Sequence, residues 1–274
     1  MASDQQNNLV KEQDDLSGVD WFHRLVDTMH RLRQPDGCPW DREQTHETLK
    51  EYLAEEAAEL FDAIDEEDDN GMKEELGDVM LQVVFHAQIA DEEGRFAVND
   101  VCRECCEKLW RRHPHVFGES QVQNSQEVLK QWDEIKKGEK EQAPESAVSN
   151  VPRHLPALHR AHKMQKKAAK TGFDWPSTEG VIAKIEEELG ELKEAVDEEN
   201  KDAVSEEIGD LLFAVVNLSR YKEQLAEDLL HQAVQKFESR FRKMEKYFAD
   251  RDVSLEDCSI EELESVWQQM KETC

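Results

Sequence analysis

The chain has 274 residues, of which 38% are hydrophobic and 35% are charged, and it contains only 11 Gly and 7 Pro. This balance favours a folded helical protein over a disordered chain or a β-sandwich, and the length suits one large or two medium-sized domains. The formal net charge of −29 argues against binding a nucleic acid polymer or an anionic membrane, because both need clustered Lys and Arg. A small phosphorylated ligand stays compatible with this charge, since bound metal ions reverse the local sign.

The first 18 residues are polar, without a basic start or an apolar stretch. We expect them to form a flexible tail and not a signal peptide. No apolar run approaches the roughly 20 residues that cross a bilayer. We therefore expect a cytoplasmic protein without membrane contact, whose six cysteines are reduced thiols.

Three helices are predicted in the first half of the chain. One carries an EExxE motif at residues 55–59, and an acidic turn follows at 65–71. A second helix is expected to open with ExxD at 75–78, and a third carries KxxxR at 108–112. Because hydrophobic residues recur with helical and not strand-like spacing, we expect an all-α domain at 19–137.

The third helix also contains Cys102-x-x-Cys105, followed by His113 and His115. This order superficially resembles a zinc site. Structural zinc sites usually add a second spaced ligand pair in a compact loop, whereas this segment is predicted to be helical. We therefore expect buried thiols here in preference to zinc.

A linker is predicted at 138–156, where Gly, Pro and Ser are frequent. It separates the first domain from a second one at 157–274. Residues 153–170 carry many Lys, Arg and His and no acid. We interpret this segment as a solvated helix or one that faces a protein partner, with contact to substrate phosphate as the alternative.

The second half repeats the order of the first. EExxE recurs at 187–191 and ExxD at 207–210, each 132 positions after its first occurrence. KxxxR recurs 128 positions on, and a Trp follows it in both halves, at Trp132 and Trp267. Acidic residues are common in this chain, but Trp is not, so duplication explains the pattern better than composition.

The repeated acids have the pattern of a metal site. On a helix, Glu187, Glu188 and Glu191 form one arc against an apolar stripe, where they are expected to be partly shielded. The helix that follows Asp210 is apolar on nearly every face and is expected to be buried, which would draw Glu207 and Asp210 inwards. Buried carboxylates need a counter-charge, and oxygen donors at this spacing suit Mg²⁺, with Mn²⁺ as a substitute. A solvated acidic face is the alternative.

Three glycines lie inside the predicted acidic helices, where Gly is unfavourable by about 1 kcal/mol relative to Ala. They are Gly77, Gly190 and Gly209. We expect close helix approach at the metal site to compensate.

With these motifs, the sequence resembles the MazG family of the all-α nucleotide pyrophosphohydrolases. EExxE followed by ExxD occurs twice, and GCPWDREQTHETL, RRHPHVFG and LPALHRAHKMQKKAAKTGFDW are typical of full-length members. The resemblance covers residues 21–271. It implies two tandem MazG-like helical bundles completed by homodimerisation. It also implies Mg²⁺-dependent hydrolysis of a nucleoside triphosphate to a monophosphate and pyrophosphate, by water attack at the α-phosphorus.

The resemblance places catalysis in the second repeat and assigns roles there. Its metal ligands are Glu188, Glu191, Glu207 and Asp210. Its substrate-binding residues are Lys184, Lys236, Arg240 and Trp267. Glu187, beside the ligands, is our candidate for the general base.

The first repeat keeps the metal ligands of the family and offers a second candidate site, at Glu56, Glu59, Glu75 and Asp78. It also keeps Lys108 and Arg112. Tyr52 occupies the position of Lys184, so one phosphate ligand is missing. The first repeat is therefore expected to bind metal or nucleotide poorly, or to have an architectural role.

Two other functions stay open from the sequence. One is a narrower house-cleaning hydrolase for damaged or deoxy nucleotides, because base selectivity depends on pocket shape. The other is a non-catalytic dimer that binds nucleotide or a partner protein as a regulator. The intact KxxxR motif and Lys184 of the second repeat speak against the regulator, since a plain acidic scaffold does not need them.

Overall fold

The computed structural model describes residues 20–139 and 146–272 of the chain. The predicted tail 1–18, residues 140–145 of the predicted linker and Cys274 lie outside this part. Within the described residues every long element is a helix and no strand occurs, which confirms the all-α class. The chain divides into two compact units, 1–140 and 141–274. The domain boundaries given above stay a prediction.

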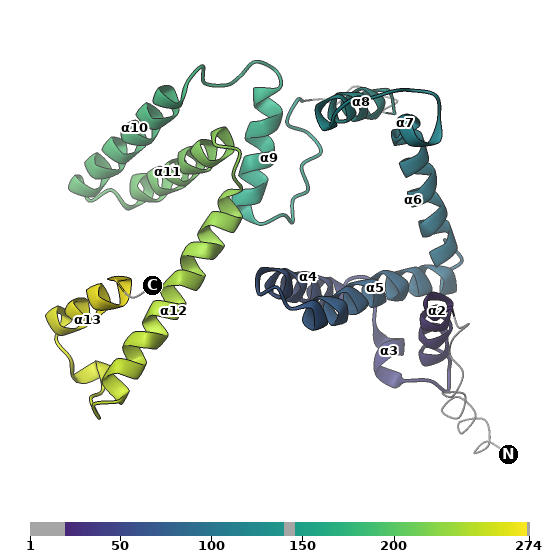
Figure 1. Ribbon diagram of the computed structural model, residues 1–274, viewed down its shortest axis with the longest axis horizontal. Coiled ribbons are helices and arrows are strands. Elements are labelled where there is room, and N and C mark those ends of the chain that lie inside the picture. Colours follow the sequence, from purple (N-terminus) through teal and green to yellow (C-terminus); the bar gives the residue numbers. More distant parts are fainter. Residues whose placement is uncertain (1–19, 140–145, 273–274) are drawn as a thin grey trace. The chain divides into compact units, whose positions relative to one another are not determined.

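The first unit is built around a pair of long helices, α4 and α5, which lie side by side (Figure 1). α2 packs against α5, and Met29, Leu49, Val84, Phe85 and Ile89 form the buried core between these helices. The elements are α2 (Trp21–Leu32), α3 (Pro39–Glu43), α4 (Leu49–Asp65), α5 (Asp69–Glu92), α6 (Val98–Arg112), α7 (Pro114–Phe117) and α8 (Ser125–Gly138).

The second unit repeats this pair as α10 and α11, with α9 packed against α11 and α12. α12 leads away from the pair (Figure 1). α13 folds back onto α12, and Met244, Phe248 and Val266 are buried between these two helices. The elements are α9 (Ala157–Ala169), α10 (Thr178–Asp197), α11 (Lys201–Tyr221), α12 (Ala226–Ala249), the short 3₁₀ helix η1 (Leu255–Asp257) and α13 (Ile260–Glu272).

The turns within the two helix pairs have the same geometry. Glu67 and Glu199, 132 positions apart, both adopt a positive φ, of 55° and 53°. The next residue in each turn, Asp68 or Asn200, donates its backbone N–H to the carbonyl five residues earlier, at 3.0 and 3.1 Å. This is the Schellman arrangement that ends a helix. The side chains of Asp68 and Asn200 then cap the next helix. The structure thus repeats where the sequence repeats.

These caps correct one prediction. ExxD does not open its helix, because α5 begins at Asp69 and α11 at Lys201, each six residues before the motif. The caps at Asp68 and Asn200 start each helix earlier, so the polar residues before the motif are part of it. Glu207 and Asp210 therefore lie well inside α11.

A second prediction, that the apolar ExxD helix is buried, is wrong for the single chain. Ile208, Leu212, Phe213 and Val215 of α11 are each about half exposed, at 46 to 52%. The physical reason is that α10 and α9 cover only part of the α11 surface. Leu76, Met80 and Val83 of α5 are similarly exposed, at 45 to 49%.

The expected close helix approach at the glycines is also wrong within one chain. A Cβ atom added at Gly77, Gly190 or Gly209 would meet no other atom within 4 Å. These glycines lie on open faces of their helices.

None of the helices in the described part of the chain combines the length and the hydropathy of a membrane span.

Candidate active site

The structure brings three of the four predicted ligands of the second repeat together. Glu188 comes from α10, and Glu207 and Asp210 lie one turn apart on α11. One carboxylate oxygen from each lies within 4.8 Å of the others. Glu188 is buried, Glu207 is half-buried and Asp210 is exposed, so the cluster opens to solvent on one side. Oxygen donors of this kind suit a hard divalent cation such as Mg²⁺.

Glu191 and Glu187 lie beside this cluster and are exposed. The expectation that the three acids of EExxE form a shielded arc is therefore correct only for Glu188, which is 5% exposed. The reason is the narrow contact of α10 with α11, which covers one side chain of the arc. Glu191 is still close enough to act electrostatically on Glu207.

The crowding of acids shifts the titration of Glu207. Burial raises the pKa of this carboxyl above its usual value, and the charges of Glu191, Glu188 and Asp210 raise it further. Ionisation of Glu207 is thus disfavoured in the folded protein. A divalent cation would relieve this repulsion.

Lys184 supplies the nearest positive charge. Its Nζ lies 2.7 Å from Glu187 Oε1 and 2.7 Å from Glu188 Oε1. These hydrogen bonds raise the pKa of Lys184 above its usual value, so the ammonium stays charged. One turn before Glu188 on α10, it is placed to contact a phosphate that reaches the acids.

A cavity of about 650 Å³ adjoins this cluster, within the range of small-molecule pockets. Lys184, Glu188 and Asp210 form part of its lining. The rest comes from the segment before α9, α9 itself, the segment before α10, and the later turns of α11. This lining consists of Val148, Met164, Gln165, Ala168, Gly172, Phe173, Asp174, Trp175, Phe213, Ala214, Asn217 and Arg220.

The three other predicted substrate-binding residues do not line this cavity. Lys236 is exposed on α12, and Arg240 is half-buried with an Nε atom that has no hydrogen-bond partner among the described residues. Trp267 of α13 packs in the cluster around Phe248, with its ring 5.2 Å from that of Phe237. A single chain therefore does not bring these three residues into the cavity beside the acids.

The first repeat forms a matching acidic cluster. Glu56 of α4 and Glu75 and Asp78 of α5 each place one oxygen within 4.8 Å of the others, whereas Glu59 is left out, as Glu191 is. Burial and neighbouring carboxylates raise the pKa of Glu56 and of Glu75. Glu75 Oε2 is buried without a hydrogen-bond partner among the described residues. The acidic donor set alone therefore does not distinguish the repeats.

The surroundings of the acids do distinguish them. Tyr52, in the position of Lys184, packs against the core of the first unit and lies edge-on to Trp40, with ring centroids 5.7 Å apart. Phe85 is 3% exposed in that core and lies 132 positions before Asn217 of the cavity. Aromatic side chains thus fill the first repeat where the second has a lysine and an amide.

The arginine of the KxxxR motif in the first repeat, Arg112, is also engaged by a side chain of its own unit. Arg112 forms a two-point ion pair with Glu139, in which Nη2 lies 2.7 Å from Oε2, and Arg111 binds the same carboxylate at 2.7 Å. The hydrogen bonds from Arg112 and Arg111 lower the pKa of Glu139 to about 2. The Arg112 guanidinium is therefore bound to the Glu139 carboxylate and is not available to a phosphate.

Comparison with known proteins gives the family. The model of the MazG nucleotide pyrophosphohydrolase domain matches residues 44–117 and 177–244. The nucleoside triphosphate pyrophosphohydrolase/pyrophosphatase MazG of Thermotoga maritima is 51% identical over 250 residues, which span 91% of this chain and 95% of that protein. The chain belongs to the MazG family. The Escherichia coli K12 nucleoside triphosphate pyrophosphohydrolase is 48% identical, over 90% of this chain and 96% of its own. The uncharacterized protein YabN of Bacillus subtilis is 46% identical, over 92% of this chain and 52% of its own.

The two MazG domain matches contain both acidic clusters and both KxxxR motifs. Trp267 and Glu139 lie outside them, as does the α9 wall of the cavity. Sequence reasoning missed Gln165, Asn217 and Glu139. The available signal was the stretch LPALHRAHKMQKKAAKTGFDW, which contains Gln165 and also Asp174, the ion-pair partner of Arg220 in the cavity lining.

The CxxC segment lies within the first MazG match and on α6, as predicted, but Cys102, Cys105 and Cys106 are exposed. The expectation of buried thiols is therefore wrong, because α6 contacts neighbouring helices along only part of its surface. His113 and His115 lie at the end of this helix and in α7. Within the described residues, neither group of potential metal ligands includes a Cys or His.

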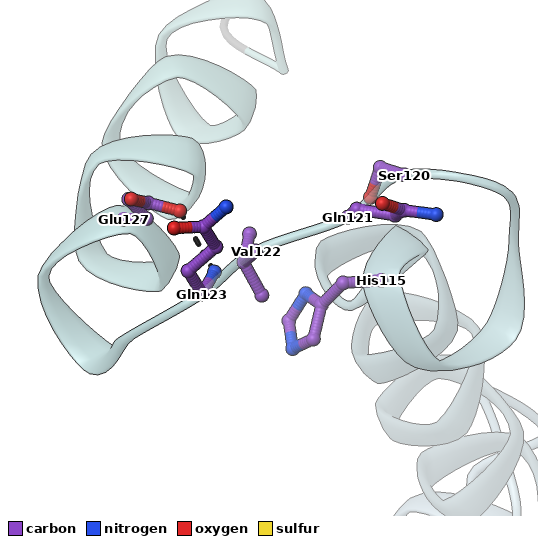
Figure 2. A pocket seen from close by; sticks show the side chains of 6 residues that line it. All are labelled: His115, Ser120, Gln121, Val122, Gln123 and Glu127. Carbon is purple, nitrogen blue, oxygen red and sulfur yellow. Dashed lines mark hydrogen bonds between the residues drawn. The ribbon is translucent and has the colours of Figure 1, made fainter.

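Figure 2 shows another hollow of the first unit, between α7 and the start of α8. His115, Ser120, Gln121, Val122, Gln123 and Glu127 line it. Its one carboxylate, on Glu127, already accepts hydrogen bonds from the Gln123 N–H and the Asn124 side chain, at 2.8 and 3.1 Å. The hollow therefore offers no free acidic donor set.

Proposed function

We propose that this chain hydrolyses nucleoside triphosphates to a nucleoside monophosphate and pyrophosphate, at the acidic cluster of α10 and α11. The observation that carries the proposal is the meeting of Glu188, Glu207 and Asp210 beside Lys184 at the mouth of a cavity. Relatives that align over nine tenths of the chain carry the name nucleoside triphosphate pyrophosphohydrolase.

The donor set fits Mg²⁺, with Mn²⁺ as a substitute, because it consists of carboxylate oxygens and includes a buried one. Glu188, Glu207 and Asp210 would hold the cation, with Glu191 as a further ligand. A bound divalent cation would neutralise phosphate charge and lower the pKa of a nucleophilic water.

The side chains of the site would act on the triphosphate in distinct ways. Lys184 binds phosphate oxygens and stays charged through its carboxylate neighbours. A water oxygen bonds to the α-phosphorus while the bond to the oxygen that bridges to the β-phosphorus breaks, so pyrophosphate leaves. Glu187 accepts the proton of the water in this scheme, and its assignment as the general base stays a prediction.

Lys236, Arg240 and Trp267 complete the proposed site from a second chain. They lie outside the cavity of their own chain, and α12 leads away from the α10 and α11 pair (Figure 1). The exposed apolar faces of α5 and α11 support the proposed homodimer, because a partner chain would cover them. Lys236 and Arg240, one turn apart, would then clamp phosphate oxygens, and Trp267 would contact the nucleotide.

The first repeat has an architectural role in this proposal. Its acids are in place, but Tyr52 and Phe85, at the positions of Lys184 and Asn217, pack in the hydrophobic core, and Arg112 is bound by Glu139. The basic segment on α9 faces α11 and α12 in part, so its predicted contact with a protein partner stays a prediction.

Product analysis tests the proposal. The purified full chain is incubated with a panel of ribo- and deoxynucleoside triphosphates and Mg²⁺ in ¹⁸O-labelled water. We expect the monophosphate and pyrophosphate in equal amounts, with the label in the monophosphate only. Diphosphate and inorganic phosphate as products, or label in pyrophosphate, would contradict attack at the α-phosphorus. Turnover confined to damaged or deoxy nucleotides would identify the narrower hydrolase, and binding without turnover would identify the regulator.

A further inference from the structure

Gln165 of α9 is a buried amide with unused hydrogen-bonding capacity. It is 8% exposed, and its Nε2 donates to the backbone oxygen of Phe213 on α11 at 2.8 Å. This bond fixes the amide so that Oε1 is the free acceptor. Oε1 is buried without a hydrogen-bond partner among the described residues, and Gln165 lines the 650 Å³ cavity. Such an acceptor is unfavourable unless a water molecule or a ligand donates to it.

Asn217, one turn after Phe213, adds a hydrogen-bond donor to the cavity. Its Oδ1 accepts from Arg220 Nε at 2.9 Å and from Nη2 at 2.8 Å. Arg220 is in turn held by Asp174, with Nη1 3.0 Å from Oδ2. Because the oxygen of Asn217 is engaged, its amide N–H₂ group is the part available to a ligand. The cavity therefore offers one fixed acceptor and one fixed donor.

The position of these amides suits one end of a nucleotide. Asp210, Phe213, Asn217 and Arg220 follow one another along the cavity side of α11. At 1.5 Å per residue, Asn217 lies about 10 Å along the helix from Asp210. This is comparable with the span of a ribose and a base. The apolar wall includes Trp175, a residue that is 40% exposed and offers an aromatic ring for stacking.

The first repeat provides an internal comparison. Its counterparts of Lys184 and Asn217 are Tyr52 and Phe85, which pack in a hydrophobic core. The unit that we consider architectural thus fills this space with aromatic rings. The unit with the proposed catalytic site keeps it open and lines it with amides.

We propose that this cavity binds the nucleobase of the substrate, with the Oε1 of Gln165 accepting from a base N–H and the Nδ2 of Asn217 donating to an adjacent base acceptor. The ligand class is a planar heterocycle with a donor next to an acceptor on one edge. This inference rests on the proposed function for the direction of the nucleotide, with phosphates at Lys184 and the acids. It adds the residues that determine recognition of the base.

Binding of monophosphates tests the inference without turnover. The dissociation constants of AMP, GMP, CMP and UMP are measured by calorimetry with Mg²⁺, together with that of ribose 5-phosphate, which lacks a base. The ratio of the ribose 5-phosphate constant to the monophosphate constant gives the contribution of the base. We expect a ratio of at least about 10 for one or more bases, since each unpaired buried polar group lowers affinity by that order.

Three variants locate this contribution. Gln165→Leu removes the acceptor at similar volume, and Asn217→Phe introduces the residue of the first repeat. Both should reduce the ratio to about 1, with the ribose 5-phosphate constant changed less than about twofold. Gln88→Leu removes another buried amide, on α5, and should leave the ratio at the parent value. Circular dichroism checks the fold, and Gln165→Leu suffices if Asn217→Phe does not fold.

A parent ratio near 1, or a ratio that both folded cavity variants leave unchanged, would overturn the inference. An unchanged ratio with an altered mass in light scattering would instead assign the cavity to contact with a second chain. Because the ratio concerns binding alone, it can succeed or fail independently of the products of hydrolysis. Failure of the inference and failure of the proposed function are therefore distinguishable.

Discussion

Glu207→Gln should stabilise the second unit when divalent cations are removed and abolish most of its stabilisation by Mg²⁺. Burial and four neighbouring carboxylates raise the pKa of Glu207 in the folded state. A raised carboxyl pKa means that the stability contributed by its neutral form is complete below the unfolded pKa and is lost as the pH rises through the folded pKa. At neutral pH the ionised Glu207 therefore destabilises the metal-free fold, and glutamine removes this effect.

The effect of Mg²⁺ on the parent can be estimated by mass action. A ligand at one hundred times its dissociation constant stabilises the folded state by about 2.7 kcal/mol. For a unit of the size of 141–274, each kcal/mol raises the melting temperature by about 3–4 °C, so the expected shift is about 10 °C. If the loss of one ligand weakens binding about a hundredfold, the same Mg²⁺ concentration stabilises by only about 0.4 kcal/mol, which gives a shift of about 1–2 °C.

Differential scanning calorimetry with EDTA and with Mg²⁺ measures both effects, and the pH series is recorded with EDTA. Glu75→Gln is the matched control, because it makes the same change at the acidic cluster of the first unit. A lower metal-free melting temperature in Glu207→Gln would show that this acid has a structural partner. An undiminished Mg²⁺ shift of the second unit would show that Glu207 does not bind the cation.

Three further predictions follow from other contacts. Lys184→Gln should lower kcat/KM for a nucleoside triphosphate by about tenfold or more, because a charge-assisted phosphate contact is lost, and steady-state assays at saturating Mg²⁺ measure this. Glu139→Gln should leave turnover within about twofold of the parent, since the ion pairs of Glu139 are with Arg111 and Arg112 of the first repeat. Because its pKa is lowered to about 2, Glu139 stabilises the first unit above its unfolded pKa, and this contribution is lost as the pH falls towards 2. Urea unfolding between pH 5 and 2 should thus depend less on pH in Glu139→Gln. Leu212→Glu, on the half-exposed face of α11, should convert a dimer into a 31.8 kDa monomer in light scattering without loss of helicity.

Much of the fold could be predicted from the repeat alone. The constant spacing of 132 positions placed the acids on equivalent helices, and the structure repeats even the turn at Glu67 and Glu199. The burial of individual residues could not be predicted in this way. A helical wheel shows which acids share a face of α10, but only the angle and contact with α11 determine that Glu188 is buried and Glu191 exposed.

The cavity could not be predicted because the stretch at 155–175 gives no sign of which of its side chains meet the residues of α11. Gln165 lies in a segment whose positive charge suggested a solvated helix, yet its amide is fixed by a backbone oxygen 48 positions later. Asn217 follows the ExxD motif inside an apolar run, and its role emerges only from the contact with Arg220 and Asp174. Long-range contacts of this kind carry no local sequence signature.

Pyrophosphate release by three proteins tests the central claim most directly. The parent, Glu207→Gln and Glu75→Gln are assayed with the same nucleoside triphosphate at saturating Mg²⁺. Metal-assisted catalysis lowers barriers by several kcal/mol, and each 1.36 kcal/mol is tenfold in rate, so loss of a ligand should slow turnover about a hundredfold or more. We predict this loss for Glu207→Gln and a much smaller one for Glu75→Gln, whose repeat has Tyr52 in place of the lysine. Loss of turnover in Glu75→Gln with normal turnover in Glu207→Gln would place the active site in the first repeat, and normal turnover in both would contradict the assignment of these acids to catalysis.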